Sequence, residues 1–460
     1  MSSAWRDTAY LIAGVCFILT LKGLSAPRTA RMGTLIGSCG AALAVVVALT
    51  TPHLKHLGLI IGAIVVGAAI GLPTARRVRM TAMPQLVSLF NAVGGGAAAL
   101  IALTDAVENG TRGLPAQTTV TTVLDLAIGG VTFSGSLIAA GKLAGRVPGR
   151  PITVPGGRAI TAALTAVAVV LATLFVAGHG GVPGLCALTL AALAAGVLLT
   201  LPIGGADMPV VISLLNACTG TAVAMAGFVL DSTPLIIAGA LVGAAGAILT
   251  KLMADAMNRP VGAILAGGYG TGDAVAVASG AGSATVREIT VDDAAIQLAY
   301  AGKVVIVPGY GLAAAQAQHE AVALAQALTD RGVRVSYGIH PVAGRMPGHM
   351  NVLLAEANAP YTQLRDLEEI NPEFPRTDVV LVIGANDVTN PAARRPGNPV
   401  SGMPILDVDK AKSIIVIKRS LGHGYAGIDN ELYADPKTAM LFADAKAGLA
   451  ALIAGLHAYA

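Results

Sequence analysis

The segment Lys303-Val-Val-Ile-Val-Pro-Gly-Tyr-Gly-Leu-Ala-Ala-Ala315 decides the fold of the C-terminal part of this chain. Its β-branched run predicts a buried strand of a parallel sheet, and the glycines after it predict a tight turn into a helix. Gly309, Gly311 and Ala314 have the spacing G-x-G-x-x-A, in which two glycines bring the backbone close to a diphosphate and a small third residue lets helix and strand pack. Since the free N–H groups of a helix N-terminus attract phosphate, the segment predicts a dinucleotide-binding turn.

The rest of this part predicts a doubly wound α/β domain of the Rossmann-like type. Strands that alternate with helices form a parallel sheet, and such sheets bind ligands beyond the carboxyl ends of their strands. The elements expected after the first strand are a helix from 312 to about 330 that stops at Gly332, strands at 333–337, 378–383, 404–408 and 413–417, and a helix from about 436 to 456.

Three polar loops follow predicted strands and are expected at this carboxyl edge. They are His340-Pro-Val-Ala-Gly-Arg-Met-Pro-Gly-His349, Gly384-Ala-Asn-Asp387 and Lys418-Arg-Ser-Leu-Gly-His-Gly-Tyr425. An NAD site of the usual kind has an acid at the end of the second strand, which binds the ribose 2′-hydroxyl. Here that strand ends in Tyr337 and Gly338, and the nearest acid, Asp330, precedes it.

Lys418 and Arg419 form an adjacent cationic pair at the end of a predicted strand. Such a pair is either a solvated part of the surface or, at a nucleotide site, a set of donors for the 2′-phosphate of NADP(H). Because the acid that would bind a free 2′-hydroxyl is missing, the sequence favours NADP(H) as the cofactor.

The composition indicates that the first part of the chain lies in a membrane. Of the 460 residues, 54% are hydrophobic and only 12% are charged, and the apolar excess lies almost entirely before Arg259. About nine segments are long enough, or nearly so, to span a bilayer, at 5–22, 33–51, 57–73, 84–103, 119–141, 160–177, 182–202, 208–230 and 233–254. The net charge of +4 is small and scattered, which argues against nucleic acid as a partner. The four cysteines lie in these spans without a C-x-x-C pair, so neither a metal site nor a disulfide framework is predicted.

Basic residues lie mainly in alternate loops, after the first, third, fifth and ninth spans. By the positive-inside rule, we expect the N-terminus outside and the C-terminal domain in the cytoplasm, in a multi-pass protein of the cell (inner) membrane. The expected organisation is a transmembrane domain at 1–258, a flexible hinge or linker rich in glycine, alanine and serine at 259–291, and the nucleotide-binding domain at 292–460.

A parallel internal repeat places polar residues in two of the spans. The stretch Met83 to Ala92 recurs as Met208 to Ala217, and both copies start on the cytoplasmic side. Serine, asparagine and glycine at i, i+3 and i+7 fall on one helix face in each copy. An amide inside a membrane must be hydrogen-bonded or hydrated, so Asn91 and Asn216 either hold helices together or line an ion path.

Other polar residues of this part have a structural explanation beside a functional one. Asp207 precedes the second repeat copy, where it could cap the helix. Asp125 lies near the outer end of the fifth span, where it could be a solvated residue at a channel mouth. Ser134 and Ser136 lie deeper in that span, where serine is more often hydrogen-bonded to its own helix than functional.

Taken together, these motifs resemble the β subunit of proton-translocating NAD(P) transhydrogenase. The resemblance rests on the segments Gly309–Gln318, His340–Glu356, Gly384–Asp387, Lys418–Ser420 and Gly424–Gly427, and it covers essentially the whole chain. It implies hydride transfer between NADH and NADP⁺ coupled to proton movement across the membrane. It also implies that this chain binds NADP(H) and contains most of the proton path, while one or more partner α subunits carry the NAD(H) domain and the remaining membrane helices. The whole enzyme would be a dimer of heteromers in membrane lipid.

The resemblance further implies roles for individual residues. Lys418 and Arg419 match contacts to the 2′-phosphate, in a family where the dinucleotide lies in reversed orientation on the sheet. Tyr425 matches a residue of a loop that closes over the cofactor, and Asp387 matches an acid near the nicotinamide that is linked to protonation. The cofactor-binding set expected from the loops and the resemblance is Gly309, Tyr310, Gly311, Ala314, His340, Val342, Ala343, Gly344, Arg345, Gly384, Ala385, Asn386, Asp387, Lys418, Arg419, Ser420, Gly424, Tyr425 and Ala426. In the membrane part, Ser136, Asp207 and Asn216 match residues implicated in coupling.

One position departs from the family pattern. Some members have a histidine where this chain has Asn91, and no histidine lies inside any predicted span here. The proton relay would then use water beside Asn91 and Asn216, or a histidine supplied by the partner subunit. A second class of function also fits the sequence: a transporter whose NADP(H)-binding domain senses redox state without hydride transfer. An NAD-binding partner would distinguish the enzyme from this alternative.

Overall fold

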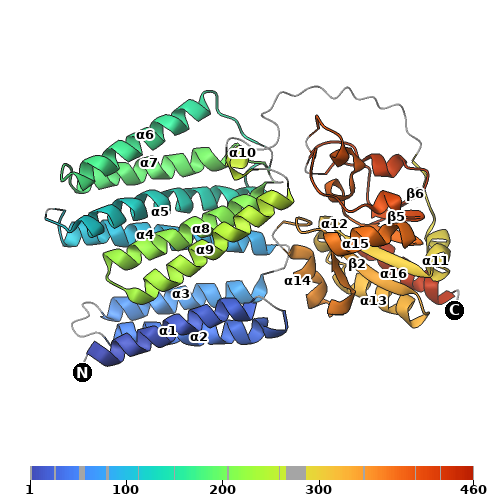
Figure 1. The fold of residues 1–460 in the computed structure, drawn as a ribbon, viewed down its shortest axis with the longest axis horizontal. Helices are drawn as coiled ribbons and strands as arrows, with labels where there is room; N and C mark the ends of the chain where they lie inside the picture. The colour runs from blue at the N-terminus through green and yellow to red at the C-terminus, as the bar shows by residue number, and fades with distance from the viewer. Residues whose placement is uncertain are drawn as a thin grey trace. The chain divides into compact units, whose positions relative to one another are not determined.

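The computed structural model describes residues 3–24, 27–50, 57–78, 82–111, 113–149, 151–204, 207–257, 260–265, 286–345, 348–398, 400–424 and 426–458 (Figure 1). The chain divides into two compact units, Met1–Pro202 with Val211–Thr250, and Ile203–Val210 with Lys251–Ala460. Within the predicted linker, the described residues include the short helix α10, Val261–Leu265, whereas 266–285 lie outside the described residues. Tyr425 also lies outside them.

The first unit is built from long apolar helices. They are α1 Ser3–Leu24, α2 Pro27–Leu49, α3 Leu57–Arg77, α4 Met83–Glu108, α5 Ala116–Leu143, α6 Gly157–Val176, α7 Val182–Thr200, α8 Met208–Val229 and α9 Thr233–Ala256. In the part of the chain that the structure describes, 9 helices are long and apolar enough to cross a membrane, which confirms the predicted spans. Pro84 stands in the first turn of α4, where its missing N–H leaves no helical hydrogen bond unmade.

Glycine lets these helices approach one another closely. At Gly129 of α5, a Cβ atom would lie 2.6 Å from the carbonyl oxygen of Gly95 in α4. At Gly220 of α8, a Cβ atom would lie 2.3 Å from the backbone nitrogen of Gly243 in α9. Because lipid provides no hydrophobic drive between helices, close backbone contacts of this kind hold a membrane bundle together through dispersion.

The second unit contains a six-stranded parallel sheet, which confirms the predicted fold class. The strands are β1 Lys303–Pro308, β2 Arg334–Ile339, β3 Leu364–Asp366, β4 Val379–Ile383, β5 Ser413–Lys418 and β6 Thr438–Phe442. Their order in the sheet is β3-β2-β1-β4-β5-β6, so the chain winds outward from β1 in one direction and from β4 in the other. The turns that follow β1 and β4 therefore meet at the point where the winding direction changes.

The two faces of the sheet are covered differently. One face contributes Val305, Val380 and Ile414 to a core that includes Phe374. Short segments cover this core: α15 Leu367–Ile370, η3 Asn371–Arg376, η6 Val408–Lys410 and η7 Glu431–Ala434. On the opposite face lies α16, Ala445–Ala458, which packs against α11, Val291–Ala299, and α13, Gln318–Asp330 (Figure 1). Successive strand residues point to opposite faces, so the central strands β1, β4 and β5 are buried on both sides, whereas the edge strand β3 is largely exposed.

The helix predicted at 312–330 is two helices. The first, α12, covers only Tyr310–Ala314, and α13 begins at Gln318. Between them, Gln316 has φ +52, a left-handed conformation that interrupts the helical hydrogen bonds. The predicted stop is confirmed, because Gly332 after α13 has φ +83.

Two further predictions were wrong. In the segment 404–408, Ile405, Leu406 and Val408 are buried, but the segment does not join the sheet because its backbone is bonded elsewhere. The Leu406 N–H donates to the Val388 carbonyl at 2.9 Å, and the Asp407 N–H donates to Asn371 Oδ1 at 3.1 Å. The helix predicted at 436–456 begins instead with β6, which pairs with β5, and only α16 is helical. The three-residue strand β3 was not predicted.

Phe374→Ala is expected to lower the free energy of unfolding of the second unit by about 3–5 kcal/mol, because Phe374 is fully buried and its removal leaves a cavity. Tyr300→Ala is the matched control, since Tyr300 is 85% exposed, and should change the free energy by less than about 0.5 kcal/mol. Urea-dependent pulse proteolysis of the detergent-purified chain measures both. Equal effects of the two substitutions would contradict the assignment of Phe374 to the core.

Candidate functional site

The turns after β1 and β4 are joined through their backbones. The Gly309 N–H donates to the Ile383 carbonyl and the Gly311 N–H to the Gly384 carbonyl, both at 2.9 Å. A Cβ atom at Gly309 would lie 2.4 Å from the Ala385 Cα, and one at Gly311 would lie 2.6 Å from the Gly384 Cα. No side chain fits between the two turns, so their contact requires glycine.

This contact changes the explanation for the glycine pattern. Gly309 has φ -131 and ψ -173, an extended conformation that any residue can adopt, so its backbone angles do not require glycine. Gly384, with φ +63, does need a left-handed conformation, and a Cβ atom there would lie 2.3 Å from the Gly311 Cα. The pattern at the first turn therefore reflects loop-to-loop packing at the switch point as well as room for a ligand.

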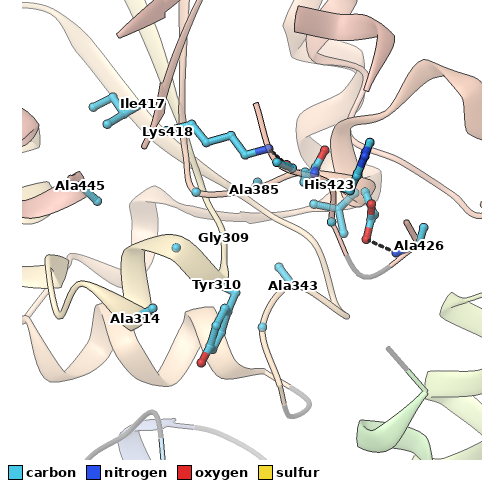
Figure 2. Close-up of a pocket in the computed structure, with 18 of the residues that line it drawn as sticks. Gly309, Tyr310, Ala314, Ala343, Ala385, Ile417, Lys418, His423, Ala426 and Ala445 are labelled. Carbon is cyan, nitrogen blue, oxygen red and sulfur yellow. Dashed lines mark hydrogen bonds between the residues drawn. The ribbon is translucent and has the colours of Figure 1, made fainter. Parts of the chain in front are cut away.

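A cleft lies at this carboxyl edge, and most of the predicted cofactor residues line it (Figure 2). These residues come from the turns after β1, β2, β4 and β5. They are Gly309, Tyr310, Gly311, Ala314, Val342, Ala343, Gly344, Gly384, Ala385, Asn386, Asp387, Lys418, Arg419, Ser420, Gly424 and Ala426. The structure thus brings together segments that are separated by more than a hundred residues in the sequence.

His340 and Arg345 are not among the described lining residues, and both support the loop after β2 instead. The Val342 N–H donates to His340 Nδ1 at 3.2 Å, so Nε2 carries the proton and donates to the Pro404 carbonyl at 2.7 Å. The ring is buried, and burial lowers the pKa of His340 to about 4, although the bond to Pro404 opposes the shift. His340 therefore stays neutral and joins this loop to the segment that was predicted as a strand.

Arg345 stacks on a residue of the first turn. Its guanidinium carbon lies 4.2 Å from the ring centre of Tyr310, a cation–π contact that joins the loops after β1 and β2. The Arg345 N–H donates to His349 Nδ1 at 3.0 Å. Burial and the nearby Arg345 charge lower the pKa of His349, so this histidine also stays neutral. Both histidines of the loop act as structural acceptors rather than as charged groups.

Asp387 is enclosed by the loop after β5. The Ala426 N–H donates to its Oδ2 at 3.1 Å (Figure 2). A Cβ atom at Gly424 would lie 2.3 Å from its Oδ1, so only glycine lets the loop close over the carboxylate. Asn386 beside it is held through its Oδ1, which accepts from the Tyr433 hydroxyl at 3.1 Å and from Asn430 Nδ2 at 3.1 Å. The acid and amide of this turn are therefore fixed in the cleft.

The cationic pair after β5 is divided between two environments. Lys418 is half-buried, donates through Nζ to the Gly422 carbonyl, and lies 4.7 Å from the ring centre of Tyr433. Burial lowers the pKa of Lys418, and the negative charge of Asp387 opposes this shift. Arg419 is exposed. One cation is therefore held inside the cleft, and the other stands at its rim.

Sequence reasoning missed part of the cleft, including Asp444 and Ala445. They follow β6, which was predicted as helix, so their position at the carboxyl edge was not foreseen. Asp444 Oδ1 accepts from the Lys446 N–H at 3.0 Å and thereby caps the start of α16. His423 also lines the cleft, with Nδ1 3.2 Å from Asp429 Oδ1. The apolar run Thr438–Phe442 was the signal that could have indicated the sixth strand.

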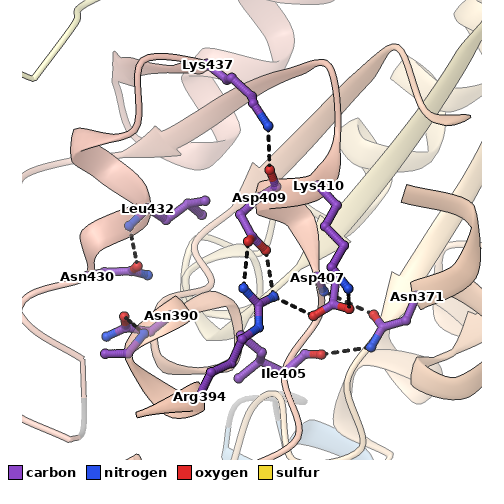
Figure 3. Close-up of polar contacts among 11 residues, drawn as sticks. Asn371, Asn390, Arg394, Ile405, Asp407, Asp409, Lys410, Asn430, Leu432 and Lys437 are labelled. Carbon is purple, nitrogen blue, oxygen red and sulfur yellow. Dashed lines mark hydrogen bonds and ion pairs between the residues drawn. The ribbon is translucent and has the colours of Figure 1, made fainter. Parts of the chain in front are cut away.

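A charged network holds the connection between β4 and β5 in place (Figure 3). Arg394 donates to Asp407 Oδ1 at 2.6 Å, and to Asp409 Oδ2 and Oδ1 at 2.6 and 2.8 Å. Asn371 Nδ2 donates to the Ile405 carbonyl at 2.9 Å. Bidentate bonds between a guanidinium and a carboxylate fix geometry more tightly than single ion pairs. The network holds this segment through side-chain bonds, although the segment does not belong to the sheet.

The predicted membrane residues form a separate group within the helical bundle. Ser88 Oγ donates to the Ser136 carbonyl at 2.8 Å, and Asn91 Nδ2 donates to the Ile212 carbonyl at 3.2 Å. Thr219 Oγ1 in turn donates to the Asn91 carbonyl at 3.2 Å. These bonds connect α4 to α5 and α8, so Ser88 and Asn91 hold helices together.

The second repeat copy has different surroundings. Ser213 Oγ donates to the Gly246 carbonyl of α9 at 3.2 Å, whereas Ile212 and Thr219 face α4. Asn216 lies one helical turn from Ile212 and Thr219, which face α4, and one turn from Ser213, which faces α9. Its side chain therefore lies between the two faces and is half-buried. Asp207 is buried directly before α8.

Two expectations about α5 are resolved. Ser134 Oγ bonds to the Gly130 carbonyl of its own helix at 3.2 Å, as predicted. A solvated position at a channel mouth was considered for Asp125, but the side chain is buried, with an exposed fraction of 0%. No group of three or more metal-ligating side chains occurs among the described residues.

The chain is similar along nearly its whole length to one family. Residues 6–455 match the family profile described as NAD(P) transhydrogenase beta subunit. A protein of Rhodospirillum rubrum named NAD(P) transhydrogenase subunit beta is 51% identical over 455 residues, which cover 97% of this chain and 98% of that protein. A second protein of this name, from a named strain of the same species, has the same identity and coverage.

The stability of the second unit is expected to fall as the pH drops from about 6.5 to about 4. In this range His340 binds a proton in the unfolded chain but not in the folded one, so protons favour unfolding. The contribution amounts to about 3 kcal/mol, fully present above the unfolded pKa. His340→Gln should flatten this part of the pH profile, whereas His319→Gln, at an exposed position, should not. Pulse proteolysis at several pH values measures the slope, and an unchanged slope in His340→Gln would contradict the assignment.

Proposed function

The chain belongs to the NAD(P) transhydrogenase beta subunit family, and we propose that within this enzyme it is the subunit that binds NADP(H), in the cleft at the carboxyl edge of its sheet. The enzyme transfers hydride between NAD(H) and NADP(H) and couples the transfer to proton translocation across the membrane. This activity excludes a redox-sensing transporter without hydride transfer. An α subunit is the partner of a β subunit, and NAD(H) is assigned to that partner, because this chain has a single dinucleotide turn.

The observation that carries the NADP(H) assignment is the charge at the cleft. β2 ends in Gly338 and Ile339, without an acid to bind a 2′-hydroxyl, and His340 after it is held neutral. Lys418 and Arg419 supply two cations at the end of β5. A 2′-phosphate between them would form charge-assisted hydrogen bonds and replace the contact of Lys418 with the Gly422 carbonyl.

The remaining cleft residues suit the rest of a dinucleotide. The joined turns at Gly309–Gly311 and Gly384–Ala385 offer backbone and no bulky side chain to a diphosphate. Asp387, fixed by Ala426, is the acid assigned to the nicotinamide end, where it would hold or release a proton as the cofactor changes state. Tyr425 belongs to the same loop and is assigned to cover the bound cofactor. His340 and Arg345 position the loop that Val342, Ala343 and Gly344 contribute.

In the membrane, the proposed proton path passes Asn91, Asn216 and Ser136, with Asp207 as the link to the nucleotide-binding domain. Amides orient water but do not titrate near neutral pH, so water or an ionisable neighbour must carry the proton. The proposed organisation has the membrane domain at 1–258, a linker at 259–291 and the NADP(H) domain at 292–460. The N-terminus lies outside and the NADP(H) domain in the cytoplasm, in a dimer of heteromers surrounded by membrane lipid.

Lys418→Ala and Arg419→Ala, made together, are expected to remove most of the preference for NADPH over NADH. Each charge-assisted hydrogen bond lost is worth about 1.5–3 kcal/mol, so NADPH affinity should fall about tenfold or more for each cation while NADH affinity changes little. Calorimetric titration of the purified chain with each nucleotide measures the ratio. Arg365→Ala is the control, because Arg365 pairs with Glu369 outside the cleft. Equal affinities for NADH and NADPH in the unmodified chain would refute the assignment.

A further inference from the structure

Asp125 of α5 is a carboxylate in an unusual position. Its exposed fraction is 0%, and neither of its side-chain oxygens has a hydrogen-bond partner among the described residues. The helix of 28 residues is about 42 Å long and exceeds a hydrocarbon core of about 30 Å. Asp125 lies about 14 Å along the axis from Ala116. If the helix is centred in the bilayer, the carboxyl group is several ångströms inside the hydrocarbon.

The side of α5 that carries Asp125 faces α4. Asp125, Gly129, Thr132 and Ser136 follow one another at i, i+4, i+7 and i+11, and so form one stripe. The backbone carbonyl of Ser136 accepts from Ser88 Oγ of α4, and a Cβ atom at Gly95 of α4 would lie 2.9 Å from the Thr132 Cβ. The stripe therefore leads from Asp125, along the α4–α5 contact, to Thr132 and Ser136. Ser136 Oγ is likewise buried without a hydrogen-bond partner among the described residues.

The groups around Asp125 do not neutralise it. At its level, α4 contributes Ala99, Ala102 and Ala106, which are buried and apolar. At the end of the neighbouring helices that lies toward the start of α5, the described titratable groups are Asp105 and Glu108 of α4 and Cys186 of α7; none is a cation. The helix α6 also packs against α5, and its one titratable side chain, Arg158, lies in its first turn at the opposite end. Asp105 is engaged by Asn109, whose Nδ2 donates to its Oδ1 at 2.7 Å. A lone ionised carboxylate in such surroundings is strongly disfavoured, so the group holds a proton until water reaches it.

We infer that Asp125 is a proton-binding site of the membrane domain, which exchanges protons between water at the end of the bundle where α4 ends and α5 begins and water beside Thr132, Ser136 and Asn91. The carboxylate takes up a proton from one side to become the neutral acid, and it returns the proton to water on the other side. No bond other than O–H forms or breaks, and no electrons move. This inference rests on the proposed function, because it supplies the ionisable group that Asn91 and Asn216 cannot provide.

The test uses the complete enzyme, with its α subunits, in sealed vesicles. Asp125→Asn keeps the size and polarity of the side chain but cannot titrate, and it is expected to lower both vesicle acidification and the coupled NADH-to-NADP⁺ rate about 100-fold. NADPH affinity, measured in the same preparation, should stay unchanged and shows that the variant is folded. Asp105→Asn is the matched control on the neighbouring helix and should leave both rates unchanged. Normal acidification by a folded Asp125→Asn variant overturns the inference.

Two further measurements keep the inference testable if the Asn variant does not assemble. Asp125→Glu retains an acid on a longer side chain, so it should couple with a shifted pH dependence; an unchanged pH profile contradicts the inference. Infrared spectroscopy should show a carboxylic acid C=O band in the unmodified enzyme that moves in Asp125→Glu, and absence of any such band also contradicts it. If the unmodified enzyme binds NADPH but does not acidify vesicles, the proposed proton path fails, whereas normal coupling in every Asp125 variant refutes the inference alone.

Discussion

The backbone contact between the turn after β1 and the turn after β4 is the constraint on which the nucleotide cleft depends. Gly309 and Gly311 donate to the carbonyls of Ile383 and Gly384, and the space between the turns admits no Cβ atom. This contact exists because β1 and β4 are neighbours at the centre of the sheet, where the winding direction changes. The loops after β2 and β5 then add to the joined turns: Arg345 stacks on Tyr310, and the loop that contains Gly424 and Ala426 closes on Asp387.

The membrane bundle follows the same physical rule in another solvent. Small residues let backbones approach, and the polar side chains then bond to carbonyl groups of neighbouring helices. In water, a polar group without a protein partner can bond to solvent, but inside a helical bundle the missing hydrogen bond costs free energy. Asp125 and Ser136 are therefore notable, because their side-chain oxygens have no hydrogen-bond partner among the described residues. A structural role accounts for Ser88 and Asn91, whereas it does not account for Asp125.

The sequence predicted what depends on composition and local pattern. The β-branched strand before Gly309, the apolar spans and the stop at Gly332 all follow from such signals, and they are confirmed. The errors concern segments whose state is set by tertiary partners. Residues 404–408 have strand-like composition, but their N–H groups donate to the Val388 carbonyl and to the Asn371 side chain instead of to a neighbouring strand. Residues 438–442 form a strand because they pair with the free edge of β5. Similarly, a solvated position was considered for Asp125, because sequence position does not reveal which helices cover a side chain.

The central claim is that the joined turns and the cations after β5 form one site that is selective for NADP(H). Amide hydrogen exchange of the purified chain, read by mass spectrometry with NADPH or NADH at equal concentration, tests it most directly. The account predicts that NADPH slows exchange together in the segments 309–315, 384–388 and 418–424, and that NADH has a much smaller effect on all three. Equal protection by both nucleotides, or protection by NADPH that spares these segments, would contradict it.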